Sequence, residues 1–86
     1  MTKNAIPILC ALYDCEADDE FSAVTITAII VMEYVHLSYS TIYNELSAMC
    51  HSGCVALGCK EGHSHTYYLT DKGMHIYKKK IIKEER

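Results

Sequence analysis

The sequence predicts a small α+β domain, and three observations favour this class. Apolar residues recur at spacings of three and four in several stretches, which is the pattern of helices with one buried face. Residues 54–59 and 66–70 are rich in apolar, aromatic and Thr residues and flank a polar loop, as the strands of a hairpin do. The chain has 86 residues, so we expect a single domain over residues 1–86 with one small core.

The composition indicates a globular chain with an uneven charge. Half of its residues are apolar, but no 18-residue run is free of charge and no signal-peptide pattern follows Lys3, so we expect a cytoplasmic protein without a membrane partner. Residues 1–37 hold one lysine against six acids, whereas residues 38–86 hold seven basic residues against five acids. A nucleic acid would therefore approach the second half, and a basic protein would prefer the first.

The first helix is predicted over residues 5–15. Asn4 is placed to cap it, and Pro7 falls in the first turn, where the missing N–H of proline costs nothing. An acidic loop follows this helix. Residues 21–24 are then short, apolar and partly alternating, which predicts a brief edge strand.

A second helix is predicted to begin at Thr25 or Thr27 and to run to Tyr34 or Val35. Either threonine can cap it, and apolar residues occupy more than one of its sides, with an excess around residues 29 and 30. One buried face cannot hide so many apolar side chains. The helix must therefore lie between two layers or contribute to a contact between subunits.

A third helix, from Ser38 to about residue 50, is the central prediction. Ser38 can cap it, and Gly53 follows its last apolar residue, as a glycine C-cap does. Its buried stripe comprises Ile42, Leu46, Met49 and Cys50. Its opposite face carries Tyr39, Ser40, Tyr43, Asn44 and Ser47. Because only residues 36–38 separate it from the second helix, we interpret the pair as a helix-turn-helix and the third helix as its recognition helix.

The strands at residues 54–59 and 66–70 are expected to pair as a hairpin around a loop at residues 60–65. Tyr67 and Leu69 should point to the core, whereas Thr66 and Tyr68 should face outward, because alternate residues of a strand face opposite sides. Thr70 can cap a last helix. The apolar residues of this helix are Met74, Tyr77 and Ile81, with Lys78, Lys79, Lys80 and Lys83 around them.

The predicted order of elements is that of a winged helix-turn-helix, with a three-helix core, a two-stranded wing and a C-terminal helix. The motif Thr41-Ile42-Tyr43, followed by Leu46, Gly53, Tyr67 and Leu69-Thr70-Asp71-Lys72-Gly73, resembles that of PadR-like transcriptional regulators over roughly residues 5–80. The chain has Tyr39-Ser40 where the family has Pro-Gly, and His63 and His65 where family wings carry Arg or Lys. The resemblance implies a regulator that binds duplex DNA.

The predicted DNA-binding residues lie on the third helix and on the wing. The helix would enter the major groove, and the wing would lie beside the backbone. The residues are Ser38, Tyr39, Ser40, Thr41, Tyr43, Asn44, Lys60, His63, His65 and Tyr68. We also expect a homodimer, because one small domain contacts few base pairs. No Lys or Arg occurs between Lys3 and Lys60, so a module that binds protein instead of DNA is the alternative.

Five cysteines and several histidines are candidate sites of metal binding or redox chemistry. Cys50, His51, Cys54, Cys59, His63 and His65 fall within sixteen residues, but their spacing is not that of two close ligand pairs. We therefore expect no metal and interpret most cysteines as thiols in the core, with a redox switch as the other alternative. No triad of nucleophile, base and orienting group and no glycine-rich phosphate loop occurs, so neither an enzyme nor a cofactor is expected.

Overall fold

Helix α3 (Tyr39–Ser52) packs against two other helices and one strand in the computed structural model, which describes residues 2–82. Ser38 precedes it with extended backbone, and the Ser38 hydroxyl accepts a hydrogen bond of 3.2 Å from the amide of Thr41. Gly53 ends it with a φ of 89°, a left-handed conformation that suits a residue without Cβ. Both predicted caps are confirmed. The buried side chains of α3 are those of Ile42, Leu46 and Met49, with Cys50 half-buried beside them.

The Ser38 cap should contribute measurably to stability. Ser38→Ala leaves the Thr41 amide without its side-chain acceptor, so we expect the free energy of unfolding to fall by about 1 kcal/mol. Urea denaturation followed by circular dichroism measures this change. Ser47→Ala, at an exposed position within the same helix, is the matched control and should leave the midpoint nearly unchanged. Equal midpoints for the two variants would show that the cap does not stabilise α3.

Helix α1 (Ala5–Asp14) forms one side of the core. Its bounds agree with the predicted helix to one residue, and Ile8, Leu9 and Leu12 are fully buried. The predicted capping role of Asn4 was wrong. Asn4 occupies the cap position, but its backbone is already helical and its side chain makes no cap hydrogen bond. The first turn is instead held by a backbone bond from the Ala5 amide to the Thr2 carbonyl at 3.2 Å.

Helix α2 (Ile26–Ile30) is shorter than predicted. Thr25 caps it by accepting a hydrogen bond of 3.3 Å from the Ala28 amide, as one of the two predictions had it. The expected continuation to Tyr34 or Val35 was wrong, because the chain leaves the helix after Ile30 and turns Val35 back into the core. Helix α2 contacts both α1 and α3, and Ile29 is fully buried. The apolar excess around Ile29 is therefore explained in part by packing between layers.

Strands β1 (Val55–Leu57) and β2 (Tyr67–Leu69) form an antiparallel pair in which Val55 lies opposite Leu69. The predicted hairpin is confirmed, but its two strands are shorter than the predicted strands at residues 54–59 and 66–70. Tyr67 and Leu69 are buried as expected, but the outward orientation predicted for Thr66 was wrong: its side chain is 2% exposed. Thr66 lies just before the ladder, and its hydroxyl donates a hydrogen bond of 2.6 Å to the Cys59 carbonyl across the base of the wing.

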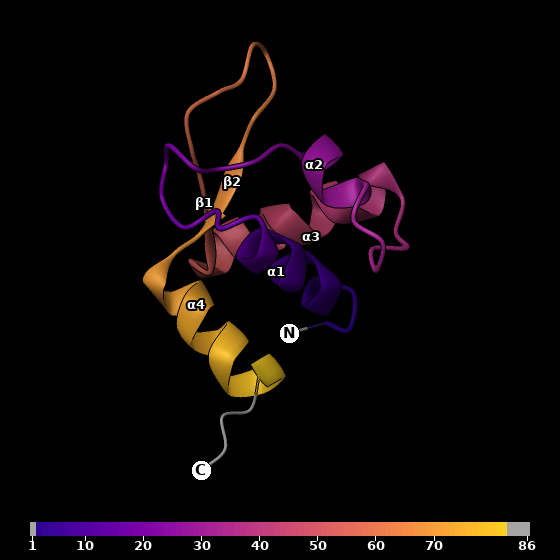
Figure 1. Cartoon of the computed structure of the whole chain (residues 1–86), viewed down its shortest axis with the longest axis vertical. Coiled ribbons are helices and arrows are strands. Elements are labelled where there is room, and N and C mark those ends of the chain that lie inside the picture. Colours follow the sequence, from indigo (N-terminus) through magenta and orange to yellow (C-terminus); the bar gives the residue numbers. More distant parts are fainter. Residues whose placement is uncertain (1, 83–86) are drawn as a thin grey trace.

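The loop that joins α1 to α2 follows the hairpin closely. The strand predicted for residues 21–24 is reduced to one bridge, in which Val24 and Tyr67 exchange hydrogen bonds of 3.0 and 2.8 Å. The Ala17 carbonyl accepts from the Leu69 amide at 2.8 Å, and the Glu20 carbonyl accepts from the Cys59 amide at 3.0 Å. Figure 1 shows this loop passing beside the hairpin. Three separate points of attachment therefore hold the acidic loop against the wing.

Helix α4 (Asp71–Tyr77) closes the core and continues as a π-helical turn, η1 (Lys78–Ile82). Thr70 caps α4 as predicted and accepts a hydrogen bond of 3.1 Å from the Gly73 amide. The Tyr77 ring is buried and stacks on that of Tyr13 with 4.4 Å between centroids. Lys83, expected on the same helix, lies outside the described residues. Within residues 2–82 no helix is both long and apolar enough to cross a membrane.

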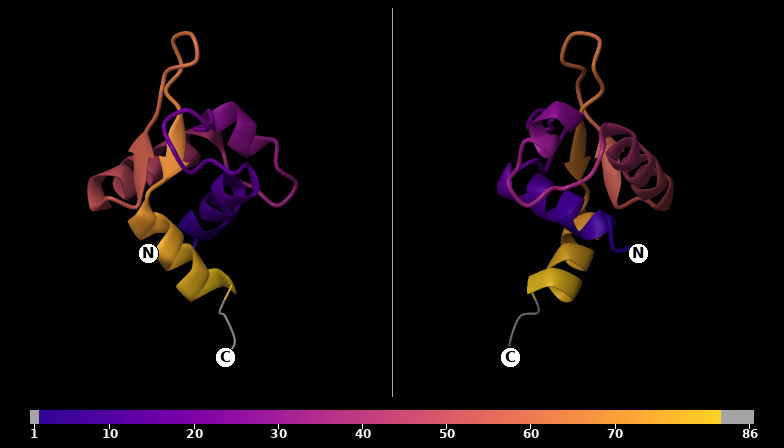
Figure 2. Two further views of the ribbon diagram at one scale, coloured as in Figure 1. Left: turned by 60° about the vertical axis from the view of Figure 1, so that its left-hand side comes forward. Right: turned by 90° about the vertical axis from the view of Figure 1, so that its right-hand side faces the viewer.

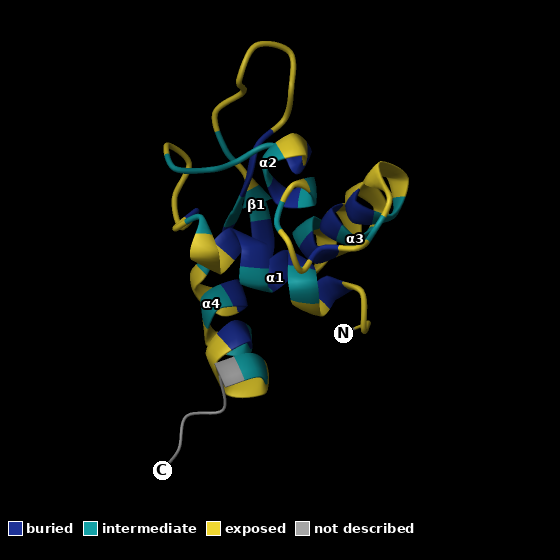
Figure 3. Cartoon of the chain, turned by 45° about the vertical axis from the view of Figure 1, so that its right-hand side comes forward, coloured by how far each residue is buried: buried dark blue, intermediate teal, exposed yellow. Residues whose placement is uncertain are grey.

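The elements form a winged helix-turn-helix. Both views of Figure 2 place the tip of the wing at one end of the molecule and η1 at the other, along an axis of 43 Å. Figure 3 shows that the wing tip is exposed, whereas the inner faces of α1 and α3 are buried. The outer surface of α3 and the wing are therefore free to contact another molecule.

Candidate nucleic-acid interface

The outer face of α3 carries uncharged polar groups. Tyr39 is 58% exposed and Tyr43 is 49% exposed, and the other exposed polar residues of this face are Ser40, Asn44 and Ser47. Ser38 and Thr41 also stabilise the start of the helix. The Ser38 hydroxyl donates to the Thr41 hydroxyl at 2.9 Å while it caps the helix, so these two side chains hold the first turn in shape. The groups best placed to reach a partner are those of the two tyrosines, the asparagine and the two remaining serines.

The wing ends in a closed turn. The backbones of Glu61 and Ser64 exchange two hydrogen bonds of 3.0 Å, and Gly62 between them has a φ of 65°, which favours glycine. Lys60, His63 and His65 are all exposed. The turn therefore presents one ammonium group and two imidazoles at the tip of the wing.

A cleft of about 180 Å³ brings the wing and α3 together. Tyr39 and Tyr43 line it from α3, and His63 and His65 line it from the wing. Its other lining residues are Thr25, Ile26, Thr27, Ser64 and Tyr67. Four of the predicted site residues, distant in sequence, therefore share one surface. Burial raises the pKa of Tyr67, with smaller contributions from Cys50 and Tyr43, so its phenol stays protonated in the neutral range.

The structure does not bring Tyr68 to this cleft. Tyr68 lines a different hollow, with Asp18, Asp19 and Glu20, because successive residues of a strand face opposite sides and Tyr67 faces the cleft. Sequence reasoning also missed Thr27, which is exposed in the first turn of α2. The predicted helix-turn-helix could have indicated this residue, because the first helix of such a pair crosses the backbone of bound DNA.

The cleft carries little fixed charge. None of its nine lining residues is Lys, Arg, Asp or Glu. Among the described lysines, Lys72 donates to the Ser52 carbonyl at 2.7 Å, and Lys78, Lys79 and Lys80 lie in η1 at the other end of the molecule. Any contact with phosphate at this surface must therefore use hydroxyls, imidazoles, backbone amides or Lys60.

Solved structures with the same fold include two that cover nearly all of this chain. TubR from Bacillus megaterium pBM400 superposes with a TM-score of 0.79 at 21% sequence identity, over 98% of this chain and 89% of TubR. BpsR of Bordetella bronchiseptica superposes with a TM-score of 0.76 at 14% identity, over 95% of this chain and 58% of BpsR. The second structure concerns the regulation of the DNA binding of BpsR by 6-hydroxynicotinic acid. At these identities the likeness shows the winged-helix fold.

No family model and no curated protein matches the chain. The PadR-like resemblance therefore stays a prediction from residues 41–73.

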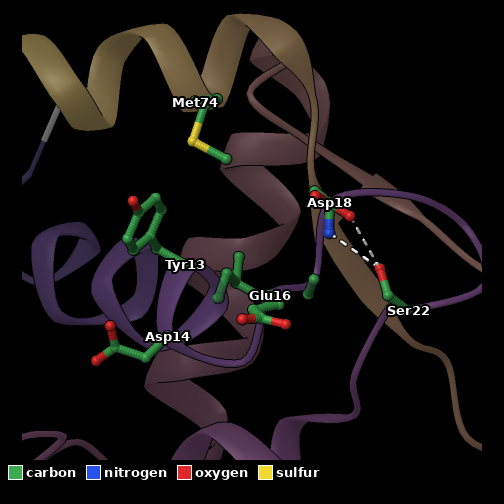
Figure 4. A pocket seen from close by; sticks show the side chains of 8 residues that line it. Tyr13, Asp14, Glu16, Asp18, Ser22 and Met74 are labelled. Atoms are coloured by element: carbon green, nitrogen blue, oxygen red, sulfur yellow. Dashed lines mark hydrogen bonds between the residues drawn. The ribbon is translucent and has the colours of Figure 1, made fainter.

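A second hollow lies where α1 ends and beside α4. Figure 4 shows Asp14, Glu16 and Asp18 around it, with Tyr13 and Met74 on the side of the helices. Its volume is about 670 Å³, and no basic residue lines it. Asp14 accepts a hydrogen bond from the Tyr34 hydroxyl.

A hydrogen-bonded turn at residues 18–22 fixes the conformation of the acidic loop. The Ser22 hydroxyl accepts from the Asp18 amide at 3.0 Å, as Figure 4 shows. Hydrogen bonds from the Ser22 amide and hydroxyl and from the Phe21 amide lower the pKa of Asp19. The same hydrogen bonds thus hold the loop in a fixed shape and favour the charged form of the Asp19 carboxylate.

The cysteines are distributed as the composition predicted. Cys54 is buried, and Cys10, Cys15 and Cys50 are half-buried against the core, whereas Cys59 is exposed. Burial raises the pKa of the Cys10, Cys15 and Cys50 thiols, which disfavours the reactive thiolate. In the part of the chain that the structure describes, no three His, Cys, Asp or Glu side chains are arranged to hold a metal ion.

Proposed function

We propose that this protein is a regulator of transcription that binds specific sequences in duplex DNA, acts in the cytoplasm and resembles the PadR-like regulators. The observation that carries the proposal is the common surface of α3 and the wing, where Tyr39 and Tyr43 meet His63 and His65. The major groove of B-DNA admits one α-helix, and exposed Ser, Tyr and Asn side chains are suited to contact phosphates and base edges. BpsR, which has the same fold, is named as a DNA-binding protein.

This arrangement assigns a role to each element. The first turns of α3 lie in the major groove, with Tyr43 and Asn44 toward the bases. The wing lies over the adjacent backbone, with Lys60 and its two histidines where the phosphates border the minor groove. Thr27, at the start of α2, lies on the same surface and can donate its hydroxyl to a phosphate. The acidic loop faces another direction, with its carboxylates beside Tyr68. The wing and α3 are therefore the parts of the molecule best suited to approach DNA.

Two substitutions on α3 test the proposal. Tyr43→Ala and Asn44→Ala remove exposed side chains only, so we expect each to weaken DNA binding about tenfold while the melting temperature stays nearly unchanged. A shift assay on mixed genomic fragments, titrated with salt, measures both affinity and its salt dependence. The logarithm of the affinity should fall linearly with the logarithm of salt concentration for parent and variants alike. Parental affinity in both variants would exclude α3 as the reader.

We also infer that the protein binds DNA as a homodimer, since two-fold pairing doubles the base pairs contacted. Ile29 cannot serve as the contact surface, because it is fully buried within one chain. A better surface is the stripe of Ile6, Cys10 and Tyr13 on α1, which are spaced by four and three residues. Ile6 is 41% exposed and Tyr13 is 37% exposed, and the stripe continues onto α4 through the Tyr13–Tyr77 stack.

Light scattering at tens of micromolar tests the dimer. The parent should have twice the mass of one chain, and Ile6→Glu should shift it to the monomer, because a charge in an apolar contact is costly to bury. Val31→Glu is the matched control. Val31 is 71% exposed and lies outside the stripe, so its variant should remain dimeric. A parent that scatters as a monomer would reject the homodimer.

A module that binds protein is the second candidate function. The acidic hollow favours it, because Asp14, Glu16 and Asp18 surround an open groove that also offers the Tyr13 and Met74 side chains. Such a surface suits a basic segment of another protein. The salt titration separates the two candidates, since a chain that binds no duplex in a salt-dependent way would be left with the acidic groove as its best surface.

A further inference from the structure

The exposed face of α3 lacks the side chains that read G·C pairs. Arg and Lys make the commonest specific contacts to guanine, and Asp or Glu accept from cytosine. The only Asp, Glu, Lys or Arg in α3 is Glu45, which is half-buried and accepts a hydrogen bond of 2.7 Å from the Thr2 hydroxyl. The other ionisable side chains of this helix are those of its tyrosines, its cysteine and His51, which lies in the last turn. Guanine and cytosine thus have no strong partner on this face.

Asn44 has the chemistry that reads adenine. A side-chain amide offers one donor and one acceptor, which match the N7 and the N6 amino group of adenine in the major groove. Asn44 is exposed in the second turn of α3, with Ser40 one turn before it and Ser47 nearly one turn after it. Among the described residues no hydrogen bond engages its side chain, so the amide is available to a base.

The neighbouring rings extend the same preference. Tyr39 and Tyr43 present large exposed faces beside Asn44 and Ser40, and an apolar surface of this kind can pack on the thymine methyl group, which is found only at A·T pairs.

The wing also favours A·T pairs. The narrow minor groove of A·T tracts has an enhanced negative potential that attracts Arg, Lys and His, and the wing tip carries Lys60, His63 and His65.

We infer that the duplex recognised by this protein is A·T-rich at the contacted positions, with Asn44 reading an adenine in the major groove and the histidines of the wing in the adjacent minor groove. This inference rests on the proposed DNA-binding function. It assigns the class of sequence that the α3 surface recognises, from the groups that this surface carries and those that it lacks.

In vitro selection from random duplexes with the full chain tests the inference. The selected sites should be rich in A·T pairs, with one adenine fixed at each half-site. Asn44→Ala should reduce the preference for that adenine over guanine by about tenfold. Asn44→Arg should move the preference to guanine, because Arg reads guanine. His51→Ala, at an exposed position in the last turn of the same helix and outside the cleft, is the matched control and should leave the preference for that adenine unchanged.

Inosine·cytosine pairs separate the two grooves. Such a pair resembles G·C in the major groove, but it lacks the guanine amino group and so resembles A·T in the minor groove. At the position read by Asn44, inosine should bind as poorly as guanine. Beside the wing, inosine should bind as well as adenine.

Two outcomes would overturn the inference in distinguishable ways. Salt-dependent binding with a selected G·C core would refute the inference and leave the proposed function intact. The absence of any enriched or salt-sensitive duplex would refute both.

Discussion

Gly73→Ala is expected to destabilise the protein by about 2 kcal/mol, although alanine is the better helix former. A Cβ at Gly73 would lie 2.0 Å from the carbonyl oxygen of Cys54 and 3.2 Å from Cδ2 of Leu69. Relieving that overlap against backbone costs about 3 kcal/mol, the upper end of the usual range for overpacking. The gain in helix propensity is only about 1 kcal/mol. The sign of the change therefore reports how closely α4 packs against the start of β1.

Urea denaturation of parent and variant measures this change. Gly62→Ala is the control, because a Cβ there meets nothing within 4 Å and the variant experiences only the strain of a φ of 65°. That strain should cost about 1 kcal/mol. The reverse order, with Gly73→Ala at least as stable as the parent, would mean that α4 is not seated on the hairpin.

DNA affinity is expected to rise roughly tenfold to a hundredfold as the pH falls from about 7.5 to about 5.5, the interval in which imidazoles take up protons. DNA phosphates stay charged throughout this interval, so a protonated imidazole at position 63 or 65 of the wing attracts them and a neutral imidazole does not. The groups around these imidazoles are Tyr39 and Tyr43 in the cleft and Lys60 and Glu61 on the wing. A charged hydrogen bond to phosphate contributes about 1.5 kcal/mol or more. The salt slope should also steepen by about one for each new contact.

Variants at the histidines assign this effect to the wing. The double variant His63→Gln and His65→Gln should bind with nearly the same affinity at both pH values. The matched control changes His51 and His75 to Gln, at exposed positions on α3 and α4 outside the cleft, and should keep the parental response. A parent whose affinity and salt slope do not change with pH would contradict the role of the imidazoles.

The local signals of the sequence predicted most of the fold. Ser38, Thr70 and Gly53 cap their helices as expected, because each acts through groups within three or four residues of itself. The glycine of the motif Leu69-Thr70-Asp71-Lys72-Gly73 also has a physical reason, since no side chain fits between α4 and Cys54. Features that depend on distant contacts were harder to predict. Helix α2 ends early because Val35 returns to the core, and no local pattern marks that return.

The candidate site was predicted residue by residue but not as a surface. The sequence identified Tyr39, Tyr43, His63 and His65 from their types and from the expected helix and wing. The sequence did not show that these four residues line one cleft, because their proximity depends on the orientation of the wing relative to α3. The place of Tyr68 depended on which strand face meets the acidic loop, and that contact joins segments almost fifty residues apart.

The attachment of the acidic loop to the hairpin has a consequence for how the two candidate surfaces relate. Backbone hydrogen bonds join the loop to the hairpin at three places: Ala17 with Leu69, Glu20 with Cys59, and Val24 with Tyr67. The loop therefore acts as a third, irregular strand that flanks the base of the wing. A molecule that reshaped this loop would disturb the hydrogen bonds that orient the wing. Linkage is reciprocal, so DNA held by the wing would change the affinity of the acidic face for that molecule by the same factor.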